Sequence, residues 1–357
     1  MLKTTGFSQP LVIAIGVSLL LGIGVGLKIY FDREARLASA IPIPALKILA
    51  YKDLFSPELK SAIMTDAGVE LSISEVSTPE ELWDQLEKRR GSEAPDLVTL
   101  FSYQVPLAAQ LGWLQAILPR RLVNQDAISP DFIDLPGDPA LHQVIPLLWG
   151  LTGIAFDSSK HGSLDSWMGV IENAKLKGKV GLPSSTIELL RLSQIEKPSG
   201  KAIATPLTKS LQPWFEGAVL AKDFLSAREL IQADSNLEVA LASHGEMAFP
   251  PFNKWKFQLP REKATLWILS LAMTRDASEE DQAYKFLDAM LKRENAKRLT
   301  ESAKQASTNR SLEELANFDS RLKPSHLRAS PFDQFILWQD FSRAREVRGA
   351  IEAAKPR

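Results

Sequence analysis

Cysteine is absent from the 357 residues of this chain. Its absence excludes disulfide bonds, thiolate nucleophiles and cysteine-ligated metals, and it also excludes an anchor attached through a lipidated cysteine. Histidine is scarce as well, because His142, His161, His244 and His326 are scattered, with no HxxxH pair among them. We therefore expect no metal site and no cofactor.

An excess of charge of either sign is also missing. Lys and Arg total 42 against 43 Asp and Glu, and the sequence pI is near 6.5. A nucleic-acid backbone requires a basic surface, so we expect no nucleic-acid partner. The sequence has no Gly-x-Ser-x-Gly elbow, and Ser184-Ser185 is therefore interpreted as a loop rather than as a nucleophile. We expect that the chain is not an enzyme.

One long apolar run is present near the start of the chain. Residues 11–31 carry a single Lys and no acidic residue, and they are about as long as one bilayer span. Two interpretations remain open, an uncleaved anchor and a signal peptide cleaved at Ala38-Ser39-Ala40. Several charged residues separate the run from that cleavage site, which favours the anchor. We predict an anchor or signal segment at 1–31 and an extended linker at 32–45.

Beyond the linker, strand and helix patterns alternate. Strands are predicted at 47–50, 69–76 and 97–100, and helices are predicted to begin at Pro57 and Pro79, each after a hydroxyl residue that can cap the helix. Parallel strands joined by helical crossovers form a sheet that is covered on both faces. The sequence therefore predicts an α/β fold.

Aromatic residues follow two of these strands directly. Tyr51 comes after the first strand, and Phe101 and Tyr103 come after the third. In open α/β sheets, ligands bind at the carboxyl ends of the strands. These side chains either line a binding site or close the strand ends by packing, and position alone leaves both interpretations open.

Five segments in a fixed order carry a family resemblance: residues 46–59 (LKILAYKDLFSPEL), 95–117 (PDLVTLFSYQVPLAAQLGWLQAI), 144–157 (VIPLLWGLTGIAFD), 165–180 and 266–310. Together they resemble the periplasmic polyamine (spermidine/putrescine)-binding proteins of ABC importers, in the bacterial extracellular solute-binding protein superfamily. Each motif is short, so the resemblance depends on their order and spacing.

The resemblance implies a two-lobed periplasmic-binding-protein fold of type II. Two parallel-rich sheets with flanking helices would be joined by hinge strands, and the lobes would close on a ligand held between them. Lobe I is expected at 46–149 and 265–320, lobe II at 150–264, and C-terminal helices at 321–357 would pack across the lobes.

Ligand-binding roles are implied for Tyr51, Phe101, Tyr103, Glu188, Trp267 and Gln339. Several positions depart from the polyamine-binding pattern. Leu269 stands where the family has an Asp, Leu54 stands where it has a Tyr, and Phe101 replaces a small hydroxyl residue. Either His244 or Gly245 aligns with the position at which the family has a Trp in its binding pocket. Loss of the Asp would leave a bound ammonium group without a charged partner, at a cost on the order of several kcal/mol.

We therefore expect a binding protein on the periplasmic side of the inner membrane, anchored through residues 11–31, that passes a small organic ligand to ABC permease subunits. The ligand is expected to differ from an ordinary polyamine, and a monoamine, an organic acid and a peptide-like metabolite are candidates. Two alternatives stay open: a degenerate binding fold that serves as a tethered interaction or sensor module, and an ordinary spermidine or putrescine binder. A cleaved, soluble periplasmic form is the alternative to anchoring.

Overall fold

The computed structural model describes residues 44–135, 138–139, 142–182, 226–262 and 264–329, together with residues 28, 192, 212, 214, 217–220 and 334–335. The described residues from 45 onward belong to one compact unit, which includes all elements named below. Within the described ranges, no helix has the length and apolar character needed to cross a membrane. The predicted anchor at 1–31, apart from Lys28, and most of the predicted linker lie outside the described residues.

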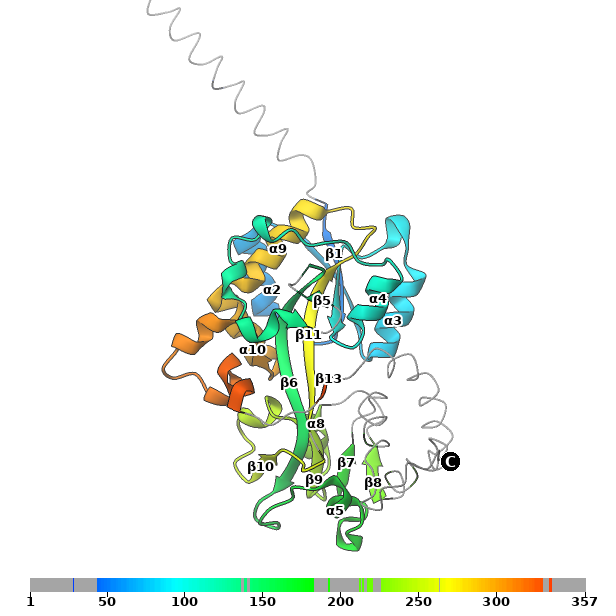
Figure 1. Cartoon of the computed structure of the whole chain (residues 1–357), viewed down its shortest axis with the longest axis vertical. Helices are drawn as coiled ribbons and strands as arrows, with labels where there is room; N and C mark the ends of the chain where they lie inside the picture. Colours follow the sequence, from blue (N-terminus) through cyan, green and yellow to red (C-terminus); the bar gives the residue numbers. More distant parts are fainter. Residues whose placement is uncertain are drawn as a thin grey trace, which may run out of the picture. The chain divides into compact units, whose positions relative to one another are not determined.

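The elements fall into two groups, lobe I and lobe II, each with its own buried apolar core. Lobe I contains β1 (Leu46–Tyr51), β2 (Leu71–Val76), β3 (Leu97–Phe101), β11 (Thr265–Met273), α2 (Pro57–Ala67), α3 (Pro79–Lys88), α4 (Val105–Gln110), α9 (Glu280–Leu291) and α10 (Arg293–Ala303). Lobe II contains α5 (Trp167–Ile171), β7 (Val180–Leu182), β8 (Ala218–Leu220), α8 (Ala227–Ala233), β9 (Val239–Ser243) and β10 (Trp255–Gln258). Figure 1 shows the two groups at opposite ends of the long strand β6 (Val144–Asp157).

Short elements complete the described chain. The short strands are β4 (Asp134–Leu135), β5 (Asp138–Pro139), β12 (Ala306–Ser307) and β13 (Gln334–Phe335). The 3-10 helices are η1 (Gly91–Glu93), η2 (Pro119–Arg121), η3 (Gln125–Ala127), η4 (Pro130–Phe132), η5 (Ala174–Leu176), η6 (Glu246–Ala248), η7 (Arg310–Glu314), η8 (Ser320–Leu322) and η9 (Pro324–Ala329).

The predicted helix starts in lobe I are confirmed. The Ser56 hydroxyl accepts a hydrogen bond from the Leu59 N–H at 3.2 Å at the start of α2, and the Thr78 hydroxyl accepts one from the Glu81 N–H at 3.1 Å at the start of α3. Gly68 ends α2 with φ of 63°, a left-handed conformation that glycine adopts without strain. The three predicted strands are present as β1, β2 and β3, and β1 pairs in parallel with both others.

The expectation of two parallel-rich sheets requires correction. In the described residues, one mixed sheet runs through both lobes in the order β2-β1-β3-β11-β6-β9-β7-β8, with β10 and β12 on β6 and β13 on β11. The lobes share this sheet because β6 has 14 residues and pairs antiparallel with β11 and β9. Antiparallel pairing at the crossing follows from a chain that enters lobe II along β6 and returns along β11.

Every residue of β6 is buried, but its side chains belong to two cores. Residues 144–151 pack in lobe I, whereas Ile154 and Phe156 pack on one face of the lobe II sheet and Ala155 on the other. This alternation follows from the two-residue period of a strand. The lobe II sheet is therefore covered on both faces.

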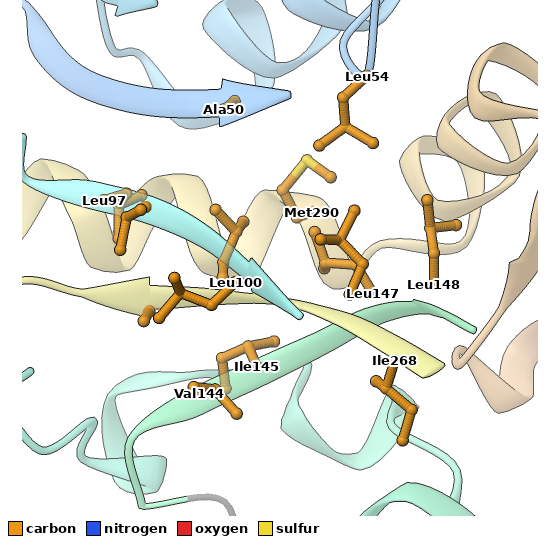
Figure 2. Packing of buried hydrophobic residues seen from close by; sticks show 14 of the residues in the cluster. Ala50, Leu54, Leu97, Leu100, Val144, Ile145, Leu147, Leu148, Ile268 and Met290 are labelled. Carbon is orange, nitrogen blue, oxygen red and sulfur yellow. The ribbon is translucent and has the colours of Figure 1, made fainter. Parts of the chain in front are cut away.

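The lobe I core includes side chains of α2, α9 and α10 on one side of the sheet and of α3 and α4 on the other. Figure 2 shows Leu97 and Leu100 of β3 above the crossing strands, and Leu54 pointing toward Met290 of α9. The α9 side chains that pack in this core are Tyr284, Phe286, Leu287, Met290 and Leu291.

The C-terminal segment differs from the predicted helices where the structure describes it. Residues 320–329 form η8 and η9, and Gln334–Phe335 form strand β13, which pairs in parallel with Thr265 and Leu266 of β11. Residues 336–357 lie outside the described ranges. The expectation of helices at 321–357 overlooked strand addition at the sheet, which depends on contacts distant in sequence.

Candidate functional site

Four of the six predicted binding residues lie together as an aromatic cluster, formed by Tyr51, Phe101, Tyr103 and Trp267. The Phe101 ring centroid is 5.1 Å from that of Tyr51, 5.4 Å from that of Tyr103 and 5.7 Å from that of Trp267. The Phe101 and Tyr103 rings are stacked with their planes at 9°, and the Trp267 ring meets Phe101 edge-on at 87°. These separations are typical of favourable aromatic pairs.

Sheet topology explains why these residues meet. Because β1 and β3 are adjacent and parallel, Tyr51 and Phe101 lie at neighbouring carboxyl ends. Strand β11 runs antiparallel to β3, with Leu269 opposite Phe101. The Ser102 N–H donates to the Ile268 carbonyl at 2.8 Å, which holds the end of β3 beside Trp267.

Gln104 links the cluster to the backbone, and sequence reasoning did not single it out. Its side chain is fully buried, and its Oε1 accepts hydrogen bonds from the Tyr51 hydroxyl at 3.2 Å and from the Phe101 N–H at 2.9 Å. Its Nε2 donates to the Pro79 carbonyl at 3.3 Å. One amide therefore connects the ends of β1 and β3 to the start of α3.

Gly150 provides the space that the Trp267 indole occupies. The two residues are partners in the β6–β11 register. A Cβ atom at Gly150 would lie 2.2 Å from Cζ2 of Trp267 and 2.6 Å from the Ser243 Oγ. The Ser243 hydroxyl in turn donates to Gln305 Oε1 at 2.7 Å. Only a residue without a side chain allows the indole to lie against β6 at this point.

The described surroundings of the cluster are weakly polar. Leu269 is buried and lies on the same face of β11 as Trp267, two residues away. Burial raises the pKa of the Tyr51 phenol well above its usual range, and the charge of nearby Glu80 raises it further, although the hydrogen bond to Gln104 opposes this shift. Tyr51 is therefore a neutral hydrogen-bonding group at physiological pH.

His244 lies where β6 passes from one lobe to the other and is 3% exposed. Its N–H donates to the Leu151 carbonyl at 3.0 Å, and its Nδ1 accepts from the Leu151 N–H at 3.0 Å. Its Nε2 donates to the Arg321 carbonyl at 3.1 Å. The ring lies 4.5 Å from Trp149 and 5.4 Å from His326. Burial lowers the pKa of His244 to about 3, so the neutral ring holds the crossing strand.

Two predicted binding residues, Glu188 and Gln339, lie outside the described residues, as does the Ser184-Ser185 loop. Of the two positions aligned with a pocket Trp, His244 contacts the crossing strand rather than the aromatic cluster. Gly245 is packed against the backbone of Gln305, because a Cβ there would lie 2.8 Å from its Cα.

Comparison with known proteins decides the family. The profile of a family described as bacterial extracellular solute-binding protein matches residues 58–321. The chain belongs to this family. Bacterial extracellular solute-binding proteins are in general not enzymes.

This solute-binding protein is similar to the spermidine/putrescine-binding periplasmic protein 1 of Haemophilus influenzae, with 22% identity over 277 residues that cover 75% of this chain and 76% of that protein. A structure of a spermidine/putrescine ABC transporter substrate-binding protein from Streptococcus pneumoniae superposes with a TM-score of 0.66 and 17% identity, covering 87% of this chain and 99% of that one. A periplasmic thiamin binding protein gives a TM-score of 0.65 with 16% identity, covering 89% and 98%. The predicted resemblance and the two-lobed fold are confirmed.

Proposed function

We propose that this solute-binding protein captures a small organic solute between its lobes and delivers it to the permease of an ABC importer. The aromatic cluster is the observation that carries this proposal. It joins the carboxyl ends of β1 and β3 to β11, one of the two strands that cross between the lobes. Ligand sites of open α/β sheets lie at such strand ends, and closure of the lobes would enclose a ligand there.

The proposed ligand is not an ordinary polyamine, although the relatives' names include spermidine and putrescine. Aromatic rings suit the methylene chain of an amine, but its ammonium groups require carboxylates as well. Leu269 offers none beside Trp267. A solute with a larger apolar part and fewer cationic groups fits this side of the cluster better, and Glu188 and Gln339 are proposed to contribute polar contacts.

Residues 11–31 are proposed to anchor the protein on the periplasmic side of the inner membrane. The length and composition of this run support the proposal. The lack of any cysteine also supports it, because a lipidated cysteine cannot provide the tether. Fractionation of cells that express the full chain tests it, since an anchored protein stays with membranes after high-salt washing.

A thermal-shift screen of residues 45–357 tests the binding function. Amines, thiamin-like cations, amino acids, organic acids and short peptides are added in turn, because a ligand bound only by the folded state raises the melting temperature. A hit that is lost in a Trp267→Ala variant supports binding at the aromatic cluster. A polyamine hit that is lost in Glu188→Gln would restore the ordinary family ligand.

A second candidate function follows from the packing of the cluster itself. Its rings contact one another at 5.1–5.7 Å rather than standing apart. Such packing also suits a fold that no longer binds a solute and serves as a tethered interaction or sensor module. That candidate is favoured if no compound of the thermal-shift screen raises the melting temperature and if a deletion strain takes up these compounds normally.

A further inference from the structure

Phe101 is the common neighbour within the aromatic cluster, since its ring contacts those of Tyr51, Tyr103 and Trp267. We infer that Phe101 is a specificity-determining residue: its phenyl ring fills the space among these three rings that an aliphatic diamine would otherwise enter, so the protein selects against polyamines. This inference rests on the proposed function, because it concerns the same site.

The ring separations support this assignment. Carbon atoms in contact lie about 3.5–4.0 Å apart, so two aromatic faces that enclose a methylene chain must stand about 7–8 Å apart. The stacked rings of Phe101 and Tyr103 have centroids 5.4 Å apart and nearly parallel planes. A methylene chain cannot enter between them. The Phe101 ring therefore occupies the space beside Tyr103 that the methylene chain of a ligand would need.

The Phe101 ring is also held in place. Its backbone N–H donates to Gln104 Oε1 at 2.9 Å. The Trp267 indole that meets its edge lies against Gly150, where a Cβ atom would be only 2.2 Å from the indole. The backbone of Phe101 and the Trp267 indole beside it are therefore both held, which favours the observed position of the Phe101 ring.

Charge acts in the same direction as size. Leu269, which is opposite Phe101 in the β3–β11 register, is buried and apolar. An ammonium group held against this pair would lose water without gaining a carboxylate from either residue, whereas the buried Glu80 acts on Tyr51, elsewhere in the cluster. By contrast, a neutral or monocationic solute with a flat apolar part can lie over the Phe101 ring, which is partly exposed.

If Phe101 excludes polyamines, removal of its ring should allow them to bind. A Phe101→Ala variant leaves a space bounded by the rings of Tyr51, Tyr103 and Trp267. Apolar cavities of about 150 Å³ bind ligands the size of benzene, and aromatic faces attract cations within about 6 Å. The variant is therefore expected to gain affinity for aliphatic amines, although it loses packing.

The test is calorimetric titration of the full-length chain with putrescine and with spermidine. Phe101→Ala is expected to bind at least one of the two at least about tenfold more tightly than wild type, because burial of two further methylene groups is worth that factor. Equal affinities in variant and wild type, or undetectable binding in both, would overturn the inference. Phe101→Leu, which keeps the site filled more fully, provides a second variant with a smaller expected gain if Phe101→Ala does not fold.

Phe286→Leu is the matched control for Phe101→Leu. Phe286 is a fully buried ring of α9 that packs edge-on against Phe55 rather than against the cluster. It is expected to lower the melting temperature without any gain in amine affinity, and an equal gain would attribute the effect to general loosening and overturn the inference. Phe101→Ala could gain affinity for an amine while the wild-type protein binds no compound of the thermal-shift screen. That result would support the inference about Phe101 and contradict the proposed importer function.

Discussion

Gly150→Ala is the smallest change that tests how the Trp267 indole is held. In the structure, the new methyl carbon would lie 2.2 Å from Cζ2 and 2.4 Å from Cε2 of the indole, and 2.6 Å from the Ser243 Oγ. Cβ atoms essentially never approach other heavy atoms within 3.0 Å, and ordinary contact begins at 3.4 Å. The indole, the β6 backbone or both must therefore move by about 1 Å.

The expected loss of stability is about 2–3 kcal/mol. Overpacking of a tight core costs about 1–3 kcal/mol. Gly150 belongs to the higher part of this range because β11 pairs with Gly150 itself on one side of β6 and β12 pairs with the neighbouring Trp149 on the other. An indole that moves away also weakens its edge contact with Phe101, and such aromatic pairs are worth about 0.5–1.5 kcal/mol. Any ligand that binds at the cluster is expected to bind more weakly.

Urea unfolding, followed by circular dichroism and tryptophan fluorescence, measures the change. Gly162→Ala is the control, because a Cβ at Gly162 has no other heavy atom within 4 Å, and its effect is expected to stay within about 1 kcal/mol. In a Trp267→Phe background the colliding indole atoms are absent, so Gly150→Ala should be less destabilising there. Wild-type stability and fluorescence in Gly150→Ala alone would refute the packing described for Trp267.

Buried polar groups give three further predictions, each measured by urea unfolding. Burial raises the pKa of Glu246 from 4.5 to about 7, so the free energy of unfolding should fall as pH rises through this interval. Glu246→Gln should make the free energy of unfolding less dependent on pH there, and parallel curves for variant and wild type would contradict the prediction. Hydrogen bonding from Lys179, with help from Lys160 and His161, lowers the pKa of Glu238 from 4.5 to about 2, so stability should fall as pH drops through that interval, and Glu238→Gln should remove this loss. His244→Phe leaves the Leu151 N–H without its acceptor and should cost about 1–3 kcal/mol, whereas an unchanged midpoint would argue against the contact.

Local signals in the sequence predicted much of lobe I. Strands β1 and β3 and the starts of α2 and α3 follow from short apolar runs and from capping residues before proline. The single mixed sheet was not predictable in the same way. A mostly apolar stretch such as 144–157 indicates a buried strand but does not reveal its partners. Those partners, β11 and β9, come much later in the chain.

The aromatic cluster was predictable in part for a similar reason. Tyr51, Phe101 and Tyr103 stand directly after strands, where ligands bind, whereas Trp267 depended on the family resemblance. Gln104 and Gly150 were missed, Gln104 because an amide in a turn has no distinctive local pattern. A glycine inside an apolar strand does indicate close approach of another group, and this signal could have identified Gly150.

The residues in and around the aromatic cluster fall into two groups, according to whether substitution of the side chain affects the backbone. Phe101 and Leu269 pair through their backbones, which any side chain permits, so their substitution can change the ligand while β3 and β11 stay paired. Gly150 and Gln104 act on the backbone itself or on the space beside it, so their substitution must alter stability and binding together. The solute-binding fold can therefore keep its strand pairing when a residue of the first kind is substituted, as at Leu269, where the family resemblance implies an Asp.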